Sequence, residues 1–132
     1  MSFERQVQIY FDDCDPAGIV LFANYFKIAH RLIEDFIRSK NIEWSEWFHA
    51  KNHGVPLVHA EADYKRPLIQ GHTYKGLVKI AILSDSSVTF STELLTQEGQ
   101  LCTQIQTVHV FIDSTSLKKM SIPPSIRQKL EA

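Results

Sequence analysis

The chain has 132 residues, of which 44% are hydrophobic and 22% are charged, and its formal net charge at pH 7 is −1. This near-neutral balance excludes broad electrostatic binding to nucleic acid, which needs a concentrated cationic face. No run approaches the ~18 apolar residues that span a bilayer, and the first residues have no apolar signal segment, so we expect no membrane span and a cytoplasmic protein.

The first third of the chain predicts a strand, an acidic turn and a long helix. Val7, Ile9 and Phe11 alternate with polar residues, which is typical of a strand over residues 4–11 with one buried face. Over residues 22–40 the apolar side chains recur every three or four positions, which predicts a helix with a continuous apolar stripe. Such a stripe indicates a helix that a larger element covers.

The rest of the chain predicts a second helix, four strands and a helical tail. Trp44, Trp47 and Phe48 share one face of a short helix within residues 41–56, for which Asn52, His53 and Gly54 form a stop signal. Four stretches alternate as strands do, over residues 57–64, 74–83, 87–97 and 101–112. A last short helix is expected over residues 123–130. This order predicts one α+β domain, residues 1–132, with an antiparallel sheet curled over the long helix.

An acidic stretch connects the first strand to the long helix. Three acids crowd a Pro-Ala-Gly turn there, and Asp15 is the candidate reactive group, because the first N–H groups of the helix that follows lack internal partners. The alternative is that an aspartate before proline merely initiates the turn. We expect Asp13 to bond the backbone of the turn. Cys14 is a poor candidate nucleophile, because the flanking acids disfavour its thiolate.

Two motifs carry a resemblance to a known family. Residues 13–20 read Asp-Cys-Asp-Pro-Ala-Gly-Ile-Val, with Asn24 and Tyr25 at the helix start, and residues 64–68 read Tyr-Lys-Arg-Pro-Leu. The chain resembles the hotdog-fold acyl-CoA thioesterases of the 4-hydroxybenzoyl-CoA thioesterase type. The resemblance implies a five-stranded antiparallel sheet wrapped around one long helix. It also implies homodimers or homotetramers, formed by joining sheets, with an active site at the dimer interface.

Within this family two segments, Pro-Leu-Val-His-Ala at residues 56–60 and Thr-Val-His-Val at residues 107–110, resemble the 1,4-dihydroxy-2-naphthoyl-CoA hydrolases of phylloquinone synthesis. The acidic motif is closer to the 4-hydroxybenzoyl-CoA enzymes. The expected function is therefore hydrolysis of an aromatic acyl-CoA, with the naphthoyl thioester first. A 4-hydroxybenzoyl-CoA or short-chain acyl-CoA thioesterase, and a non-catalytic acyl-CoA or acyl-carrier binding module, are the alternatives.

The resemblance implies roles for individual residues. Asp15 matches the catalytic carboxylate, acting as nucleophile or general base, and the backbone N–H of Phe22 matches the oxyanion donor. Gly18, Tyr25 and His59 are expected to contact substrate, although a turn glycine, a core tyrosine and a strand histidine satisfied within the protein are equally good interpretations. No histidine or cysteine spacing is typical of a metal site, and no cofactor is expected, since CoA is part of the substrate.

Overall fold

The computed structural model describes residues 3–132, and Met1 and Ser2 of the predicted domain lie outside the described residues. The elements follow in the order β1 (Phe3–Gln8), a 3₁₀ turn (Phe11–Asp13), α1 (Asn24–Ser39), α2 (Trp44–Phe48), β2 (His53–Gly54), β3 (Leu57–Tyr64), β4 (Thr73–Leu83), β5 (Ser87–Leu95), β6 (Leu101–Val110), β7 (Ile112–Asp113) and α3 (Pro124–Glu131). No helix within residues 3–132 is both long and apolar enough to cross a membrane.

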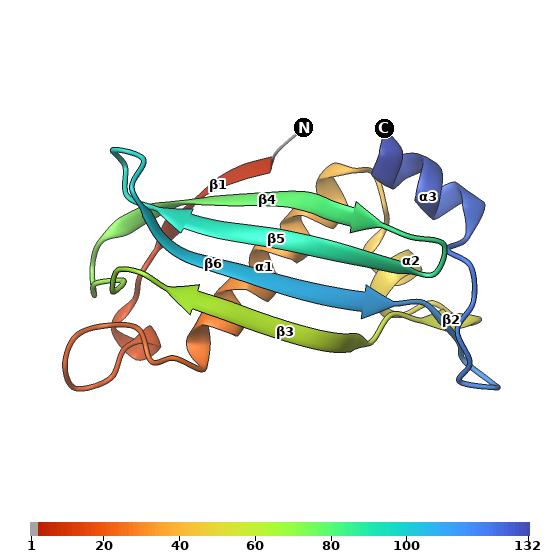
Figure 1. Ribbon diagram of the computed structural model, residues 1–132, viewed down its shortest axis with the longest axis horizontal. Helices are drawn as coiled ribbons and strands as arrows, with labels where there is room; N and C mark the ends of the chain where they lie inside the picture. The colour runs from red at the N-terminus through yellow and green to blue at the C-terminus, as the bar shows by residue number, and fades with distance from the viewer. Residues whose placement is uncertain (1–2) are drawn as a thin grey trace.

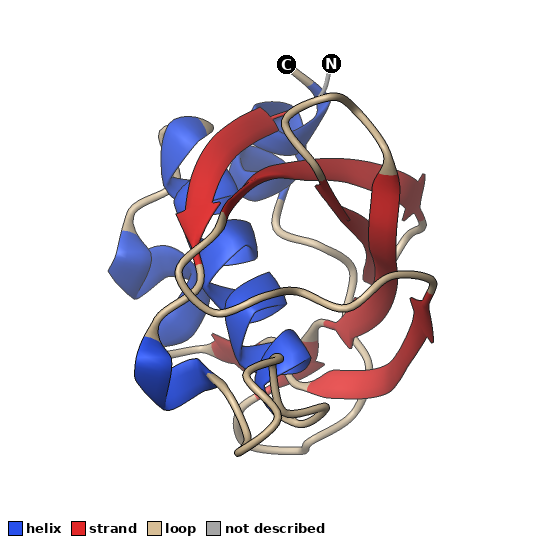
Figure 2. Cartoon of the chain, turned by 90° about the vertical axis from the view of Figure 1, so that its left-hand side faces the viewer, coloured by secondary structure: helices blue, strands red, loops and turns tan. Residues whose placement is uncertain are grey.

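Five strands form one antiparallel sheet in the order β1-β4-β5-β6-β3, while β2 and β7 form a separate two-stranded sheet. Figure 1 shows α1 crossing behind this sheet, with the loop that precedes α1 at one end of the molecule and α2 and α3 at the other. In Figure 2 the sheet curves around the helices, which lie together on its inner side. The predicted α+β architecture is confirmed.

The apolar stripe of α1 fills the inner face of the sheet. Phe36 is fully buried there, and its ring packs edge-on against Phe3 of β1 and Phe90 of β5, with ring centroids 5.9 and 5.8 Å apart. Gly76 on β4 faces Leu32 of α1 so closely that an added Cβ would lie 2.8 Å from the Leu32 side chain. The absence of a side chain at Gly76 therefore sets how closely the helix approaches the sheet.

The predicted strands agree with β3 to β6, and the predicted tail helix with α3, apart from small shifts of their ends. Two predictions were wrong. Phe11 is 80% exposed rather than buried, because the chain leaves β1 after Gln8 and turns through a 3₁₀ segment. The second helix ends at Phe48, and its expected stop signal instead contains β2, which exists only because β7 pairs with it.

We expect Gly76→Ala to destabilise the fold by about 1–3 kcal/mol, because the new methyl group would overpack the contact between β4 and α1. The measurement is urea unfolding followed by circular dichroism, with activity assayed in parallel. Gly54→Ala is a matched control, because a Cβ there would meet only Ile112, at an ordinary 3.8 Å. Equal stabilities of the two variants would contradict this account of the packing.

Candidate active site

The loop of residues 12–20, here called the acid loop, is held by backbone hydrogen bonds within itself and to a neighbouring segment. Within the loop the Asp15 N–H donates to the Ile19 carbonyl at 3.0 Å, and the Gly18 N–H donates to the Asp15 carbonyl at 3.0 Å. The loop is also bound to the segment after β3, since the Val20 N–H donates to the Leu68 carbonyl at 3.0 Å. Gly18 adopts a φ of +80°, a backbone conformation that favours glycine and agrees with its interpretation as a turn residue.

The Asp15 side chain takes part in this turn and remains available for chemistry. Its Oδ1 accepts a hydrogen bond from the Ala17 N–H at 2.9 Å, which is the turn-initiating role expected of an aspartate before proline. No donor among residues 3–132 bonds to Oδ2. The side chain is half-buried. One oxygen therefore orients the carboxylate, and the other is a free acceptor.

Asp13 and Asn24 connect the acid loop to the start of α1. Oδ2 of Asp13 accepts from the Tyr10 N–H at 2.9 Å, so its predicted backbone role is confirmed. The Asp13 carbonyl accepts from the Asn24 side-chain amide at 2.9 Å and from the Leu21 N–H at 3.1 Å. Sequence reasoning assigned no role to Asn24. Its signal is an amide side chain at the first position of a helix, where side-chain hydrogen bonds to the preceding loop are common.

The turn that begins α1 leaves two N–H groups without an acceptor. The Leu21 and Phe22 carbonyls accept from the Asn24 and Tyr25 N–H groups, but the N–H groups of Phe22 and Ala23 have no acceptor within residues 3–132. The resemblance selects the one at Phe22. It lies at the positive end of the helix dipole. The Phe22 side chain is 70% exposed, so this residue is not part of the core. The backbone at Phe22 can therefore bind an anionic oxygen.

Tyr25 is a buried core residue, and His59 lies on the outer face of the sheet. Tyr25 is 4% exposed and packs edge-on against Tyr64 at 4.7 Å, and burial raises the pKa of its hydroxyl. His59 pairs with Val108 of β6, whereas the next residue pairs with Thr107 of the inner face. Alternation along the strand therefore places His59 on the outer face, where Nε2 lies 3.2 Å from the Glu61 carboxylate.

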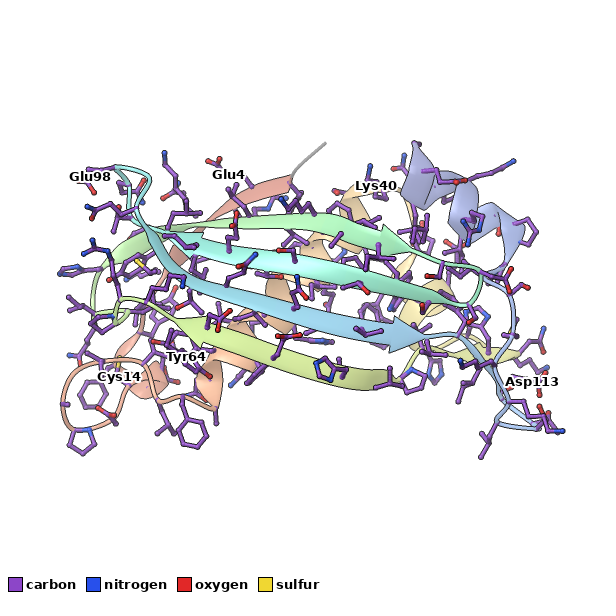
Figure 3. All side chains as sticks on the ribbon, in the orientation of Figure 1. Glu4, Cys14, Lys40, Tyr64, Glu98 and Asp113 are labelled. Atoms are coloured by element: carbon purple, nitrogen blue, oxygen red, sulfur yellow. The ribbon has the colours of Figure 1, made fainter. Side chains whose placement is uncertain are left out.

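Cys14 lies within the acid loop but is not activated. Burial and then the neighbouring acids, Asp13, Asp15 and Asp12, raise the pKa of its thiol, which disfavours the thiolate, as expected. Figure 3 shows Cys14 and Tyr64 at the same end of the molecule, opposite Asp113. Across residues 3–132 no three His, Cys, Asp or Glu side chains come together in a way that could hold a metal ion.

A cavity of about 180 Å³, here called the aromatic cavity, lies between α1, α2 and the start of β3. Its lining side chains include Phe26, His30, Trp47, Phe48, Thr107 and His109. Trp47 packs edge-on against Phe111 at 5.2 Å, and Phe48 stacks on Trp44 at 5.8 Å, so the aromatic wall is rigidly packed. Trp47 and Phe48 belong to the aromatic face predicted for the second helix, whereas the sequence did not indicate Phe26, His30 and Thr107 as part of a site.

A larger cavity of about 630 Å³ lies between the loops that follow β3 and β5. Its wall includes Arg66, His72 and Gln97. Ile69 also lines it and pairs with Ile19 of the acid loop, so this cavity borders the loop. The lining is more polar than that of the aromatic cavity and suits a charged ligand group.

Comparison with known proteins identifies the family of the chain. Residues 9–130 match the thioesterase-like superfamily. The 1,4-dihydroxy-2-naphthoyl-CoA hydrolase of Nostoc punctiforme is 32% identical over 132 residues, which cover 99% of this chain and 88% of that protein. A second relative of that name, from Rippkaea orientalis, is 28% identical over a match that covers 99% of this chain and 95% of that protein.

Solved structures superpose closely. The crystal structure of a 1,4-dihydroxy-2-naphthoyl-CoA thioesterase from Synechocystis has a TM-score of 0.90 at 25% identity, covering 98% of this chain and 96% of that one. A gentisyl-coenzyme A thioesterase has a TM-score of 0.84 at 25% identity, over a match that covers 97% of this chain and 99% of that one. The match over residues 9–130 and the 32% identity show that this chain belongs to the thioesterase-like superfamily, as a hydrolase with the hotdog fold.

Proposed function

We propose that this chain hydrolyses an aromatic acyl-CoA thioester to the free acid and CoA, with 1,4-dihydroxy-2-naphthoyl-CoA, of phylloquinone synthesis, as its substrate. One observation carries the proposal. The acid loop holds Asp15 with Oδ2 free of donors from residues 3–132, and the same loop is bonded to the start of α1, where the Phe22 N–H has no acceptor among those residues. The relative that is 32% identical bears this hydrolase name and supports the choice of acyl group.

The reaction needs both groups. The thioester carbonyl oxygen becomes negative in the transition state, and the Phe22 N–H at the positive end of α1 stabilises it. In a nucleophilic route Asp15 Oδ2 attacks the carbonyl carbon, the C–S bond breaks to release CoA thiolate, and water then opens the mixed anhydride. In a general-base route Oδ2 takes a proton from the water that attacks the same carbon. Both routes use the free oxygen.

The acyl group then extends along α1. Phe26 and His30 are four residues apart, so they lie on one face of α1 at an interval of ~6 Å, and Phe22 precedes the helix by two residues. Phe26 and His30 line the aromatic cavity, which supports an acyl group that extends into this cavity from a carbonyl at the Phe22 N–H. The cavity volume of about 180 Å³ exceeds the ~150 Å³ of a dry cavity that binds benzene, which favours a ring system larger than one ring.

The larger cavity suits the CoA part of the substrate. It borders the acid loop through Ile69, and Arg66 on its wall can pair with a phosphate. Lys65 is adjacent in sequence and exposed, and adds a second cation at the same end of β3. The thioester would therefore lie between a polar cavity for CoA and an aromatic cavity for the acyl group.

We also propose a homodimer formed through β3. This strand is at the edge of the sheet, and Leu57, Val58 and Tyr64 on it are 52, 58 and 49% exposed. Apolar edge strands of this length pair readily with another chain. A two-fold axis through β3 pairs the strand antiparallel with its copy. The start of one β3, beside the aromatic cavity, then lies near the acid loop of the partner.

Two other functions each have one supporting observation. Hydrolysis of a single-ring hydroxybenzoyl-CoA is supported by the gentisyl-coenzyme A thioesterase that is 25% identical over nearly the whole chain. A non-catalytic acyl-CoA binding module is supported by the hydrogen bond from the Ala17 N–H to Asp15 Oδ1, since that bond alone would explain an aspartate here. The free Oδ2 favours catalysis over binding alone.

Asp15→Asn should lower turnover by at least ~10²-fold, because it removes the acid–base or nucleophilic group. Asparagine keeps an oxygen that can accept from the Ala17 N–H, so the turn should persist. CoA release is followed with a thiol reagent, and Asp12→Asn, an exposed position with the same change of charge, is the matched control. Near-normal turnover in Asp15→Asn would contradict the catalytic assignment.

The substrate is tested by comparing kcat/KM for 1,4-dihydroxy-2-naphthoyl-CoA, 4-hydroxybenzoyl-CoA and butyryl-CoA. The volume and aromatic lining of the cavity lead us to expect the order naphthoyl, benzoyl, butyryl. A preference for butyryl-CoA would contradict the proposed acyl group. Binding of all three thioesters without release of CoA would favour the binding module.

The wild-type chain should sediment as a dimer or a larger assembly, and Val58→Lys should shift it toward the monomer, because lysine on an edge strand opposes strand pairing. The measurement is sedimentation velocity across a range of protein concentrations. Ile82→Lys is the matched control, since Ile82 is 59% exposed but lies on β4, away from the open edge. A monomeric wild type would exclude the dimer.

A further inference from the structure

Thr107 and His109 form a buried polar pair in the wall of the aromatic cavity. Both lie on the inner face of β6 and are only 6 and 7% exposed. Nε2 of His109 lies 3.2 Å from the Thr107 hydroxyl oxygen. The His109 ring packs edge-on against Phe90 with centroids 5.5 Å apart, which fixes its orientation. Hydrolysis at Asp15 uses neither side chain.

His109 is neutral at physiological pH. Burial in the core lowers the pKa of its imidazole, the nearby His30 lowers it further, and together they bring it from 6.5 to about 4. The Val55 backbone acts in the opposite direction, as a hydrogen-bond acceptor that favours a proton on the ring. The ring therefore keeps one proton and one lone pair.

The neighbours of the ring allow its proton to be assigned. The Val55 backbone raises the pKa as a hydrogen-bond acceptor does, and an acceptor needs a proton on the ring nitrogen that it meets. Nε2 lies 3.2 Å from the Thr107 hydroxyl oxygen. We therefore assign the ring proton to Nδ1, so that Nε2 accepts from the Thr107 hydroxyl. With its proton donated to Nε2, the Thr107 oxygen offers only lone pairs to the cavity.

We propose that Thr107 selects the acyl group by accepting a hydrogen bond from a hydroxyl on its aromatic ring, and that His109 is the positioning residue that makes Thr107 an acceptor. This inference rests on the proposed function, because it requires an aromatic acyl group in the cavity. An acyl group without the hydroxyl would displace water from the Thr107 oxygen and leave that oxygen unpaired, which disfavours its binding.

The wall around Thr107 adds to this selectivity. Apart from His30 and His109, the side chains that line the cavity with it are apolar or aromatic, so a ring hydroxyl placed elsewhere would lose its hydrogen bonds to water. His30 is exposed, with 53% of its side chain accessible, and lies within 3.9 Å of Glu34. Thr107 is therefore the buried acceptor that a ring hydroxyl meets in this cavity.

The test compares two thioesters, 1,4-dihydroxy-2-naphthoyl-CoA and 2-naphthoyl-CoA, which differ only in the ring hydroxyls. Thr107→Val removes the hydroxyl and preserves the shape of the side chain, whereas Thr107→Ser retains a hydroxyl. We expect the ratio of the two kcat/KM values to fall by about tenfold or more in Thr107→Val and to stay within about threefold of wild type in Thr107→Ser. Melting temperatures are recorded to identify loss of fold.

His109→Phe tests the positioning role. Phenylalanine preserves the edge-on packing against Phe90 but cannot accept from Thr107, whose hydroxyl is then free to rotate. We expect the same ratio to fall, mainly through a higher KM for the hydroxylated thioester. A purely structural role for His109 would instead lower kcat/KM for both thioesters equally and leave the ratio unchanged, which would overturn its positioning role.

Equal losses on both thioesters in Thr107→Val, or a wild type without preference for the hydroxylated thioester, would overturn the selection by Thr107. Asp15→Asn assayed on 2-naphthoyl-CoA tests the catalytic assignment separately, because that thioester has no ring hydroxyl for Thr107 to bind. A wild type that releases CoA from butyryl-CoA and from neither naphthoyl thioester would reject the aromatic substrate, and the role of Thr107 with it.

Discussion

Leu32 of α1 lies against Gly76 of β4 at a distance that admits no side chain at the glycine, and Val7 of β1 approaches the same point. This contact fixes the distance between the helix axis and the sheet. Phe36, farther along the same face of α1, packs between Phe3 and Phe90, which fixes the helix along its length. The position of the N-terminus of α1 follows from these contacts, and so does the position of the Phe22 N–H.

The acid loop is positioned differently, by backbone hydrogen bonds rather than by packing. The Asp13 carbonyl receives two donors from the start of α1, and the Val20 N–H donates to the segment after β3. Several aromatic side chains near the loop, among them Phe11 and Phe22, are largely exposed. Its shape therefore depends on polar groups whose geometry is directional, as the placement of a reactive carboxylate requires.

Most of the fold could be predicted because its signals are periodic. The stripe of α1 and the alternation of β3 to β6 each extend over eight or more residues. The wrong predictions concern segments whose structure depends on pairing with a distant strand or on the geometry of a turn. β2 has two residues and exists only through β7, and Phe11 continues an alternating pattern into a segment where the backbone already turns.

In the candidate site, only the residues that are close in sequence could be predicted together. Asp15 and Phe22 belong to one short motif, so the sequence contains their relation. The face on which His59 lies depends on an irregularity in the pairing of β3 with β6 between Leu57 and His59, and a slip of one residue reverses the face of each side chain. The grouping of Thr107 with Phe26 and His30 depends on how α1 crosses the sheet, which no local pattern contains.

In the proposed reaction, the hydrogen bond from the Ala17 N–H to Oδ1 of Asp15 has a consequence for the entropy of catalysis. A free carboxylate on a loop rotates about two bonds, and it would lose that freedom each time a thioester bound. Here the loop has already restricted the rotation during folding, so the free oxygen is oriented before the substrate arrives. The bond that makes Asp15 resemble an ordinary turn residue thus also preorganises it for the role that we propose.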